Sequence, residues 1–192
     1  MRLIETCCAA AVAAMVLATP AWAQTPQSEH ARTLTRFAAA TEVQLRDVAA
    51  FVRVIPENRA DVAVGYVNAG LTPAPEYRIS RRRLIVDGKL RRQIRSCRLV
   101  GADGFEVQTA RQGRLSGAEL PVIEVRVPQN ATVTASGAVR LWMGPAQVVH
   151  FRLDACGDAD LARVEDEAEI AVAGSGDVRL GGGRQLVGRR VG

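Results

Sequence analysis

The chain has 192 residues and a formal net charge of +5, and Lys89 is its only lysine, so arginine carries the basic charge. Arginine-rich basic proteins can bind nucleic acid, but the signal peptide predicted below would export the chain, and an exported chain meets little nucleic acid. The charge therefore points to anionic envelope polymers or lipid headgroups as partners, or to solubility alone.

The first 23 residues have the pattern of a secretory signal peptide. Arg2 supplies the positive charge, an apolar run follows from Cys7 to Leu17, and Ala21-Trp22-Ala23 is an A-x-A cleavage site. The run is shorter than the ~20 residues that span a bilayer. We therefore predict cleavage before Gln24, a periplasmic or secreted protein and no transmembrane segment. An N-terminal membrane anchor is the alternative.

Signal-peptide cleavage would leave about 170 residues, consistent with one domain. It would also remove Cys7 and Cys8, leaving Cys97 and Cys156 as the remaining cysteines. Disulfides persist outside the cytoplasm, and an even pair in an exported chain favours one bond. The sequence predicts a Cys97–Cys156 disulfide, with two buried free thiols as the alternative.

Strand signals dominate after a polar and then alanine-rich stretch, residues 24–40, which we interpret as a flexible leader, with one short helix as the alternative. Alternating apolar residues predict strands over residues 51–55, 61–67 and 122–127. Asp87-Gly88 separates two further β-rich runs, 84–86 and 90–94, and such a dipeptide is a strong hairpin signal. The expected fold class is all-β.

The predicted hairpin carries many arginines. Alternate residues of a strand share a face, so Arg81 with Arg83, and Arg91 with Arg95, could line one side. Guanidinium groups match carboxylates and phosphates. These four arginines are the candidate anion-binding residues, for an anionic glycan, an envelope polymer or a lipid headgroup. The alternative is a solvated hairpin face.

An internal repeat occupies residues 131–180. Segments 131–141, 151–161 and 170–180 superpose without gaps, with glycines at 137, 157 and 176, which gives a period of 19 to 20 residues. Such a period indicates stacked rungs of a β-solenoid, with a β-sandwich as the alternative. We expect the inward side chains to form two columns. These columns are Val133, Leu153 and Val172, and Leu141, Leu161 and Leu180.

Several ordered segments resemble the bacterial head-GIN family of unknown function, also called the putative autotransporter-adhesin domain. They are Ala173-Gly174-Ser175-Gly176-Asp177-Val178, Ala155-Cys156-Gly157-Asp158, Val54-Ile55-Pro56-Glu57-Asn58, and Val86-Asp87-Gly88 before Cys97. The resemblance covers residues 41–181 and implies a right-handed β-helix-like fold in the cell envelope, with no activity. Family members usually continue with more rungs. Here a basic glycine-rich tail, residues 182–192, follows, so we expect an open last rung and weak self-association through it.

Catalytic and metal-binding patterns are missing from the sequence. The only histidines are His30 and His150, and no nucleophile elbow, phosphate loop or zinc spacing is present. We expect no cofactor, no metal and no nucleic acid, and a non-catalytic envelope scaffold or adhesion module. The alternative is a polysaccharide-active enzyme, because β-helices often carry lyase sites.

Overall fold

The computed structural model describes residues 34–67, 71–101 and 104–190. The chain divides into two units, Met1–His30 and Ala31–Gly192, and all the described residues belong to the second. The predicted signal peptide, residues 1–23, and residues 24–33 of the predicted leader lie outside the described residues. The rest of the predicted leader, residues 34–40, differs from the prediction, because Thr35–Phe37 form a strand that pairs with residues 62–64.

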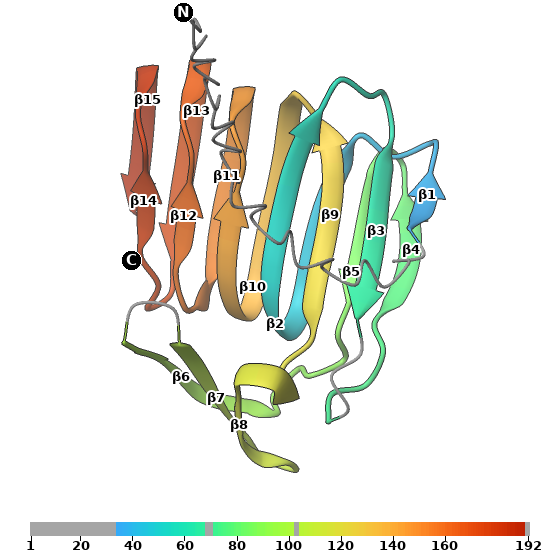
Figure 1. The fold of residues 1–192 in the computed structure, drawn as a ribbon, viewed down its shortest axis with the longest axis vertical. Helices are drawn as coiled ribbons and strands as arrows, with labels where there is room; N and C mark the ends of the chain where they lie inside the picture. The colour runs from blue at the N-terminus through green and yellow to red at the C-terminus, as the bar shows by residue number, and fades with distance from the viewer. Residues whose placement is uncertain (1–33, 68–70, 102–103, 191–192) are drawn as a thin grey trace, which may run out of the picture. The chain divides into compact units, whose positions relative to one another are not determined.

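Among the described residues, the regular elements are strands apart from the 3-10 helix Gly117–Glu119, so the all-β prediction is confirmed (Figure 1). One sheet has twelve strands and a second, small sheet has three. The small sheet contains β6 (Ile94–Val100), β7 (Gly104–Thr109) and β8 (Gly113–Ser116). The large sheet contains β1 (Thr35–Phe37), β2 (Glu42–Glu57), β3 (Val62–Val67), β4 (Glu76–Ser80), β5 (Arg83–Asp87), β9 (Val122–Pro128), β10 (Asn130–Met143), β11 (Ala146–Cys156), β12 (Ala159–Leu161), β13 (Val164–Ala173), β14 (Val178–Leu180) and β15 (Gly183–Arg190).

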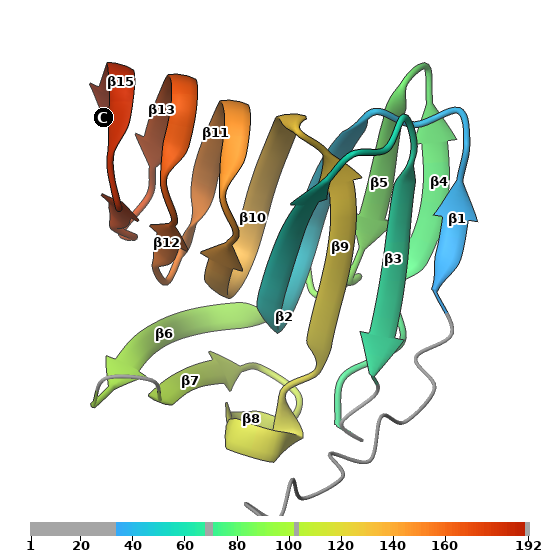
Figure 2. The same cartoon turned by 45° about the horizontal axis from the view of Figure 1, so that its top comes forward.

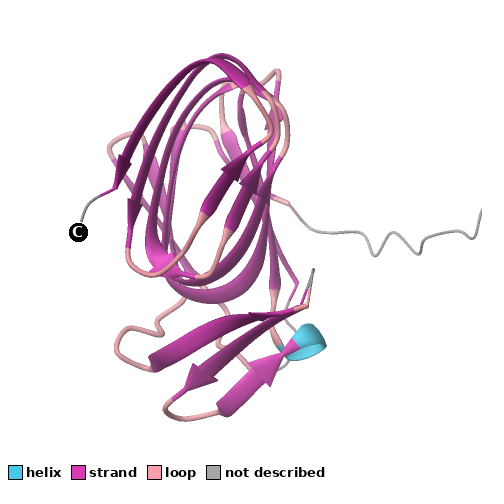
Figure 3. Ribbon diagram, turned by 90° about the vertical axis from the view of Figure 1, so that its left-hand side faces the viewer, coloured by secondary structure: helices cyan, strands magenta, loops and turns pink. Residues whose placement is uncertain are grey.

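The large sheet is built around a parallel stack of five layers: β2, then β10, then β11 with β12, then β13 with β14, and finally β15. The long strands bend, so each complete layer contributes to two walls that face one another (Figure 3). The first wall holds the first halves of β2 and β10 followed by β11, β13 and β15. The second wall holds their second halves followed by β12 and β14. We call these the first and second walls throughout.

On the other side of β2, each wall gains one more parallel strand. β5 pairs with the first half of β2 and β9 pairs with its second half. Antiparallel strands then complete the sheet, with β4 beside β5, and β3 and β1 beyond β9 (Figure 2). The hairpin in this region joins β4 to β5 through Arg81 and Arg82. The predicted hairpin at Asp87-Gly88 is therefore wrong, since β5 ends there and β6 joins the other sheet.

The space between the walls is filled by alternate apolar side chains, as the period of two along a strand requires. Fully buried examples are Leu45, Val133, Leu141 and Leu153, each with no exposed surface. Each fully buried side chain of this size contributes about 1.5–3 kcal/mol. The apolar core therefore runs along the stack as one continuous cluster.

The predicted columns are confirmed in one half and wrong in the other. Leu153 pairs with Val172 and Leu161 pairs with Leu180, as expected. Val133, however, pairs with Phe151 rather than Leu153, and Met143 takes the predicted place of Leu141 beside Leu161. Paired residues of β10 and β11 are two residues closer together in the sequence than Gly137 and Gly157 are. A two-residue shift keeps the same side chains inward.

Glycines lie at the corners where the chain passes from the first wall to the second. Gly137, Gly157 and Gly174 have φ values of 109°, 111° and 94°, a region that only glycine adopts readily. A Cβ on Gly157 would lie 2.0 Å from the carbonyl oxygen of Val139 in the preceding layer. The backbone at this corner thus packs directly against the backbone of the preceding layer, and a side chain at Gly157 would push the two layers apart.

The C-terminal segment corrects another expectation. Residues 182–192 were expected to form a basic tail, but Gly183–Arg190 form β15, which pairs in parallel with β13. The pairing covers the first wall of the fourth layer and leaves β14 without a further partner among the described residues. In the part of the chain that the structure describes, the fifth layer therefore contributes to the first wall alone.

A second, smaller core lies between the corner of the stack and the three-stranded sheet. It is centred on Phe105, Val107 and Leu115, which pack against Ala49 and Ala138. The Cys97–Cys156 disulfide joins β6 to the end of β11 at this contact, with Cα atoms 5.9 Å apart. The disulfide predicted from the sequence is therefore present, and it fastens the small sheet to the third layer.

A carboxylate ties β1 to the turn after β2. Asp61 accepts hydrogen bonds from Nε of Arg59 at 2.9 Å and Nε of Arg36 at 3.0 Å. These bonds, that from Arg59 first, hold the pKa of Asp61 below its ordinary value of 3.8. A depressed pKa means that the ionised carboxylate stabilises the folded protein above the unfolded-state pKa, and that this stability is lost as the pH falls through the folded-state value.

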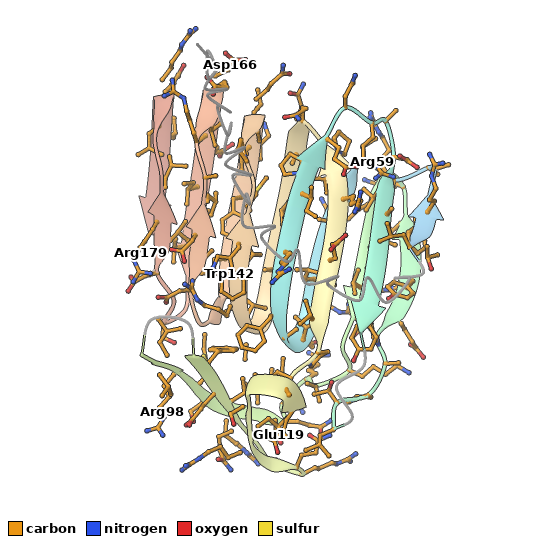
Figure 4. The ribbon with its side chains drawn as sticks, in the orientation of Figure 1. Arg59, Arg98, Glu119, Trp142, Asp166 and Arg179 are labelled. Atoms are coloured by element: carbon orange, nitrogen blue, oxygen red, sulfur yellow. A yellow bond between two sulfur atoms is a disulfide. The ribbon has the colours of Figure 1, made fainter. Side chains whose placement is uncertain are left out.

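We therefore expect Asp61→Asn to lower the free energy of unfolding near neutral pH by about 1–3 kcal/mol, because two hydrogen bonds to a charged group are weakened. The difference from wild type should shrink between about pH 5 and about pH 2, where the wild-type carboxylate becomes protonated. Urea unfolding at several pH values measures both effects. Asp166→Asn is the control, since Asp166 is exposed and makes no ion pair among the described residues (Figure 4). A constant difference across this range would contradict the prediction.

Candidate functional site

The four arginines predicted to bind anions do not lie in one place. Arg81 and Arg83 border a hollow of about 390 Å³ at the β4–β5 turn, where Arg83 Nη2 lies 3.0 Å from Glu42 Oε2. Arg91 follows β5 and borders a different hollow, and Arg95 is an exposed residue of β6. The two hollows share no lining residue. Arg91 is therefore separated from the arginines of the turn.

The larger hollow, about 540 Å³, lies on the outer face of the first wall, and we call it the β2–β10–β11 hollow. Outward-facing residues of three neighbouring strands form its floor, because alternate residues of a strand point away from the core. Gln44, Thr134 and Arg152 are direct neighbours across β2, β10 and β11. The complete lining is Gln44, Arg46, Asp47, Arg91, Thr134, Ser136, Gly137, Arg152 and Asp154.

A bulge in β2 shapes one side of this hollow. Arg46 and Asp47 together oppose the single residue Ser136, and Asp47 has a φ of 52°. The backbone N–H of Asp47 donates to Ser136 Oγ at 3.3 Å, and that hydroxyl donates to the carbonyl of Leu45 at 3.4 Å. The Ser136 hydroxyl thus holds the extra residue in place.

The charges around the hollow are partly paired. Arg46 donates from Nε to Asp87 Oδ2 at 3.1 Å, and its Nη2 also contacts that oxygen. Burial raises the pKa of Asp87, but the N–H of Lys89 and the guanidinium of Arg46 outweigh it, so the net shift is downward. Arg152 Nη2 lies 3.7 Å from Asp154 Oδ2, and both side chains are about half exposed.

Arg91 makes no ion pair with any residue that the structure describes. Three guanidinium groups and two carboxylates line the hollow. The carboxylate of Asp87, paired with Arg46, brings the two signs to equal number, so Arg91 is the guanidinium available to a ligand. Hydroxyl and amide groups of Ser136, Thr134 and Gln44 lie among them. Such a surface can accept a ligand that is rich in hydroxyl groups and carries a carboxylate, because arginine binds carboxylates through two parallel hydrogen bonds.

Sequence reasoning missed Gln44, Arg46 and Arg152 as members of this site. They are far apart in the sequence and become neighbours only through the parallel pairing of β2, β10 and β11. The repeat contained a usable signal, because outward residues of successive layers must align. It would have identified the row through Thr134 and Arg152 only with the correct step of 18 residues between those two positions.

A second polar cluster lies on the outer side of the second wall. Arg140 is only 4% exposed, its Nη2 lies 2.5 Å from Asp160 Oδ2, and its guanidinium carbon lies 4.8 Å from the centre of the Trp142 ring. Arg179 lies 3.4 Å from Asp160 and 3.5 Å from Asp158 (Figure 4). The cluster therefore links the second, third and fourth layers by charge. Its residues line neither of the two hollows described above.

Other chemistry finds little support in the described part of the chain. His150 Nδ1 lies 3.0 Å from Glu169 Oε2 on an exposed surface. In residues 34–67, 71–101 and 104–190, no group of three or more histidine, cysteine, aspartate or glutamate side chains could hold a metal ion. None of the helical segments in the same ranges has the length and apolar character to cross a membrane.

Comparison with known proteins gives little further information. No family model matches the chain, and no curated protein matches it. A solved structure, that of a putative cell adhesion protein from Clostridium sporogenes, aligns with 83% of this chain and 99% of its own, at 7% sequence identity and a TM-score of 0.31.

Proposed function

We propose that the chain is an exported, non-catalytic binding module of the cell envelope, and that its β2–β10–β11 hollow takes a glycan that carries carboxylate groups. The observation that carries this proposal is the gathering of Arg46, Arg91 and Arg152 around one open hollow. They come from β2, the segment after β5, and β11. The guanidinium of Arg91, which has no ion-pair partner among the described residues, and the neighbouring hydroxyl and amide groups match a polymer with both carboxylates and hydroxyls.

The architecture supports this role. We propose a β-solenoid-like fold, with layers that repeat every 18 to 19 residues in the C-terminal half, because Val133 pairs with Phe151 and Phe151 pairs with Ile170. Parallel pairing favours a solenoid over a sandwich, whose sheets are antiparallel. A stack of parallel strands places outward side chains at intervals of about 4.8 Å, so it offers an extended polymer a regular row of contacts.

The test uses polygalacturonate as the carboxylated glycan and measures its affinity for the whole exported protein by calorimetry. We expect the double variant Arg91→Gln/Arg152→Gln to bind at least about tenfold more weakly, because each charged hydrogen bond contributes about 1.5–3 kcal/mol. Binding should also lose part of its salt dependence. The control is Arg81→Gln/Arg83→Gln at the separate turn, which should bind like wild type.

If Arg81→Gln/Arg83→Gln weakened binding and Arg91→Gln/Arg152→Gln did not, the binding site would instead lie at the β4–β5 turn. Absence of binding by the wild-type protein would overturn the proposal.

A polysaccharide-active enzyme is the second candidate. The observation in its favour is that two carboxylates, Asp47 and Asp154, line the same hollow, since glycoside hydrolysis uses a pair of carboxyl groups on either side of the scissile bond. The release of new reducing ends from the polymer, lost in Asp154→Asn, would establish the enzyme in place of the binding module. We expect the polymer to remain intact.

A further inference from the structure

Arg91 is held beside the β2–β10–β11 hollow by two anchors. On one side, the N–H of Leu90 donates to the Asp47 carbonyl at 3.0 Å, which fixes the chain to β2. On the other side, the N–H of Ala110, just after β7, donates to the Gln93 carbonyl at 2.7 Å, which fixes it to the small sheet. Arg91 lies in the turn between these two points. Its position therefore depends on where the small sheet lies.

The backbone on both sides of Arg91 is strained. Lys89 has a φ of 57° and Arg92 has a φ of 59°, in the left-handed region that is unfavourable for residues other than glycine. Such conformations persist where surrounding contacts hold them. Leu90, which is 2% exposed, makes contacts of this kind, since it belongs to the same small core as Phe105 of the small sheet. The turn would therefore relax if the small sheet moved away.

The small sheet has a shallow apolar contact with the corners of the stack (Figure 2). The buried residues that β2 and β10 contribute to the small core are Ala49 and Ala138, and Phe51 is partly buried beside them. Small side chains bury little apolar surface and stabilise a contact correspondingly little. The Cys97–Cys156 disulfide is thus a major part of what fastens the small sheet to the stack.

The disulfide is open to solvent at Cys97. This residue lines a surface hollow of about 180 Å³, and Arg98, Glu106 and Arg114 lie among the other lining residues. Glu106 Oε2 is shared between two guanidinium groups, at 2.7 Å from Arg98 Nη2 and 3.9 Å from Arg114 Nε. Guanidinium groups outnumber carboxylates in this lining, and cationic surroundings favour a thiolate over a thiol. Cys97 Sγ is therefore the sulfur that an external thiolate can reach.

We propose that Cys97 is a site of thiol–disulfide exchange and that reduction of its disulfide withdraws Arg91 from the β2–β10–β11 hollow. The effect on ligand binding rests on the function proposed above for that hollow. Reduction separates the small sheet from the stack, removes the cover of Leu90 and lets the turn around Arg91 relax. The redox state of the disulfide thus regulates the binding site.

The reductant is an external dithiol. One of its thiolates attacks Cys97 Sγ, a bond forms between these two sulfur atoms, and the Cys97–Cys156 bond breaks. Cys156 Sγ leaves with the electron pair and takes up a proton. The second thiolate of the dithiol then displaces Cys97 Sγ, which is protonated in turn. The dithiol ends as a disulfide, and the protein has gained two electrons and two protons.

The first test compares the oxidised and the reduced whole exported protein, with dithiothreitol as the dithiol and polygalacturonate as the ligand. Affinity measured by calorimetry should fall by about tenfold on reduction and return on reoxidation. The matched control is Arg91→Gln, whose affinity should not fall further on reduction, because the guanidinium that reduction withdraws is already absent. Circular dichroism should show that the stack stays folded in the reduced protein.

A second readout needs no ligand. Trypsin should cleave after Arg91 and Arg92 at least about tenfold faster in the reduced protein, because a released turn enters the protease more often. Cleavage after Arg81 and Arg82 in the β4–β5 turn is the control and should not change. Both pairs are exposed, so a difference between them reports release of the backbone. Treatment with the monothiol 2-mercaptoethanol, followed by an acid quench, should place the adduct on Cys97.

Equal affinity of the oxidised and reduced proteins would overturn the proposal, and so would cleavage after Arg91 that reduction does not accelerate. Global unfolding on reduction, or an adduct on Cys156 alone, would overturn it as well. If neither form of the protein bound polygalacturonate, the proposed binding function would fail. The cleavage rates would then decide by themselves whether the disulfide controls the position of Arg91.

Discussion

Gly157→Ala should destabilise the protein by about 2–6 kcal/mol, the sum of roughly 1–3 for backbone strain and 1–3 for forced separation of packed groups. Gly157 has a φ of 111°, and an added Cβ would lie 2.0 Å from the Val139 carbonyl oxygen and 3.2 Å from the Phe105 ring. The substitution would therefore push apart the second and third layers and disturb the small core. Urea unfolding, followed by circular dichroism, measures the loss.

Two other glycines separate the causes of this loss. Gly113 has a φ of 74° and open space around its Cβ position, so Gly113→Ala tests backbone strain alone. A Cβ on Gly176 would lie 2.0 Å from the Gly157 carbonyl oxygen, and its φ is outside the left-handed region, so Gly176→Ala tests the close approach alone. Each should cost less than Gly157→Ala. A Gly157→Ala protein as stable as Gly113→Ala would show that the layers can separate there without cost.

Removal of the disulfide should have a comparable effect. The double variant Cys97→Ala/Cys156→Ala should lose about 4 kcal/mol by the chain-entropy model, because the bond closes a loop between residues 59 apart in the sequence. It also releases the small sheet from the third layer. Denaturant unfolding with and without reductant measures the loss, and the m-value should rise because the unfolded chain becomes less compact.

The reduced wild-type protein is the control for the double variant. Both lack the cross-link, so both should unfold at similar denaturant concentrations. The variant differs from the reduced protein only in that the two sulfur atoms are lost from the small core. Free thiols at Cys97 and Cys156 in protein purified without reductant would contradict the prediction, as would an unfolding midpoint that reductant does not change.

The apolar pattern of the repeat was sufficient to predict the inward face of each layer. It was insufficient to predict the register, because a shift by two residues keeps every apolar side chain inward. Glycine did not resolve this ambiguity. Gly157 rests on Val139, whereas Gly174 rests on Ala155, so a corner accepts glycine at either of two positions two residues apart. The alignment of Gly137 with Gly157 matched two different corner positions.

The wrong hairpin has a similar cause. Gly88 was interpreted as a turn residue, but a Cβ there would lie 2.7 Å from the Asp47 carbonyl oxygen. The N–H of Gly88 also donates to the Arg46 carbonyl at 2.9 Å. Glycine is required at this position because the chain passes close to the β2 bulge. The local sequence around Gly88 does not indicate that residues 46 and 47 lie beside it, so this contact could not be predicted.

The candidate site depended on the same information. Arg91 could be selected from its local sequence, whereas Arg46 and Arg152 join it only through long-range pairing. β15 was missed because its glycines and arginines obscure the short apolar pair Leu186-Val187. The local sequence was therefore sufficient to predict most single strands, but it was insufficient to predict which strands lie beside one another.

The pairing of β2 with β10 also determines how non-local the chain's contacts are. Glu42 pairs with Thr132, whereas Val133 pairs with Phe151 and Phe151 with Ile170. The first joint must close a loop of about ninety residues, and each later joint closes one of about twenty; the entropic cost grows with the logarithm of loop length. High contact order slows folding, and here it is concentrated in the pairings of β2 and β3 with the later strands β9 and β10. The C-terminal layers can then add one after another to an edge that already exists.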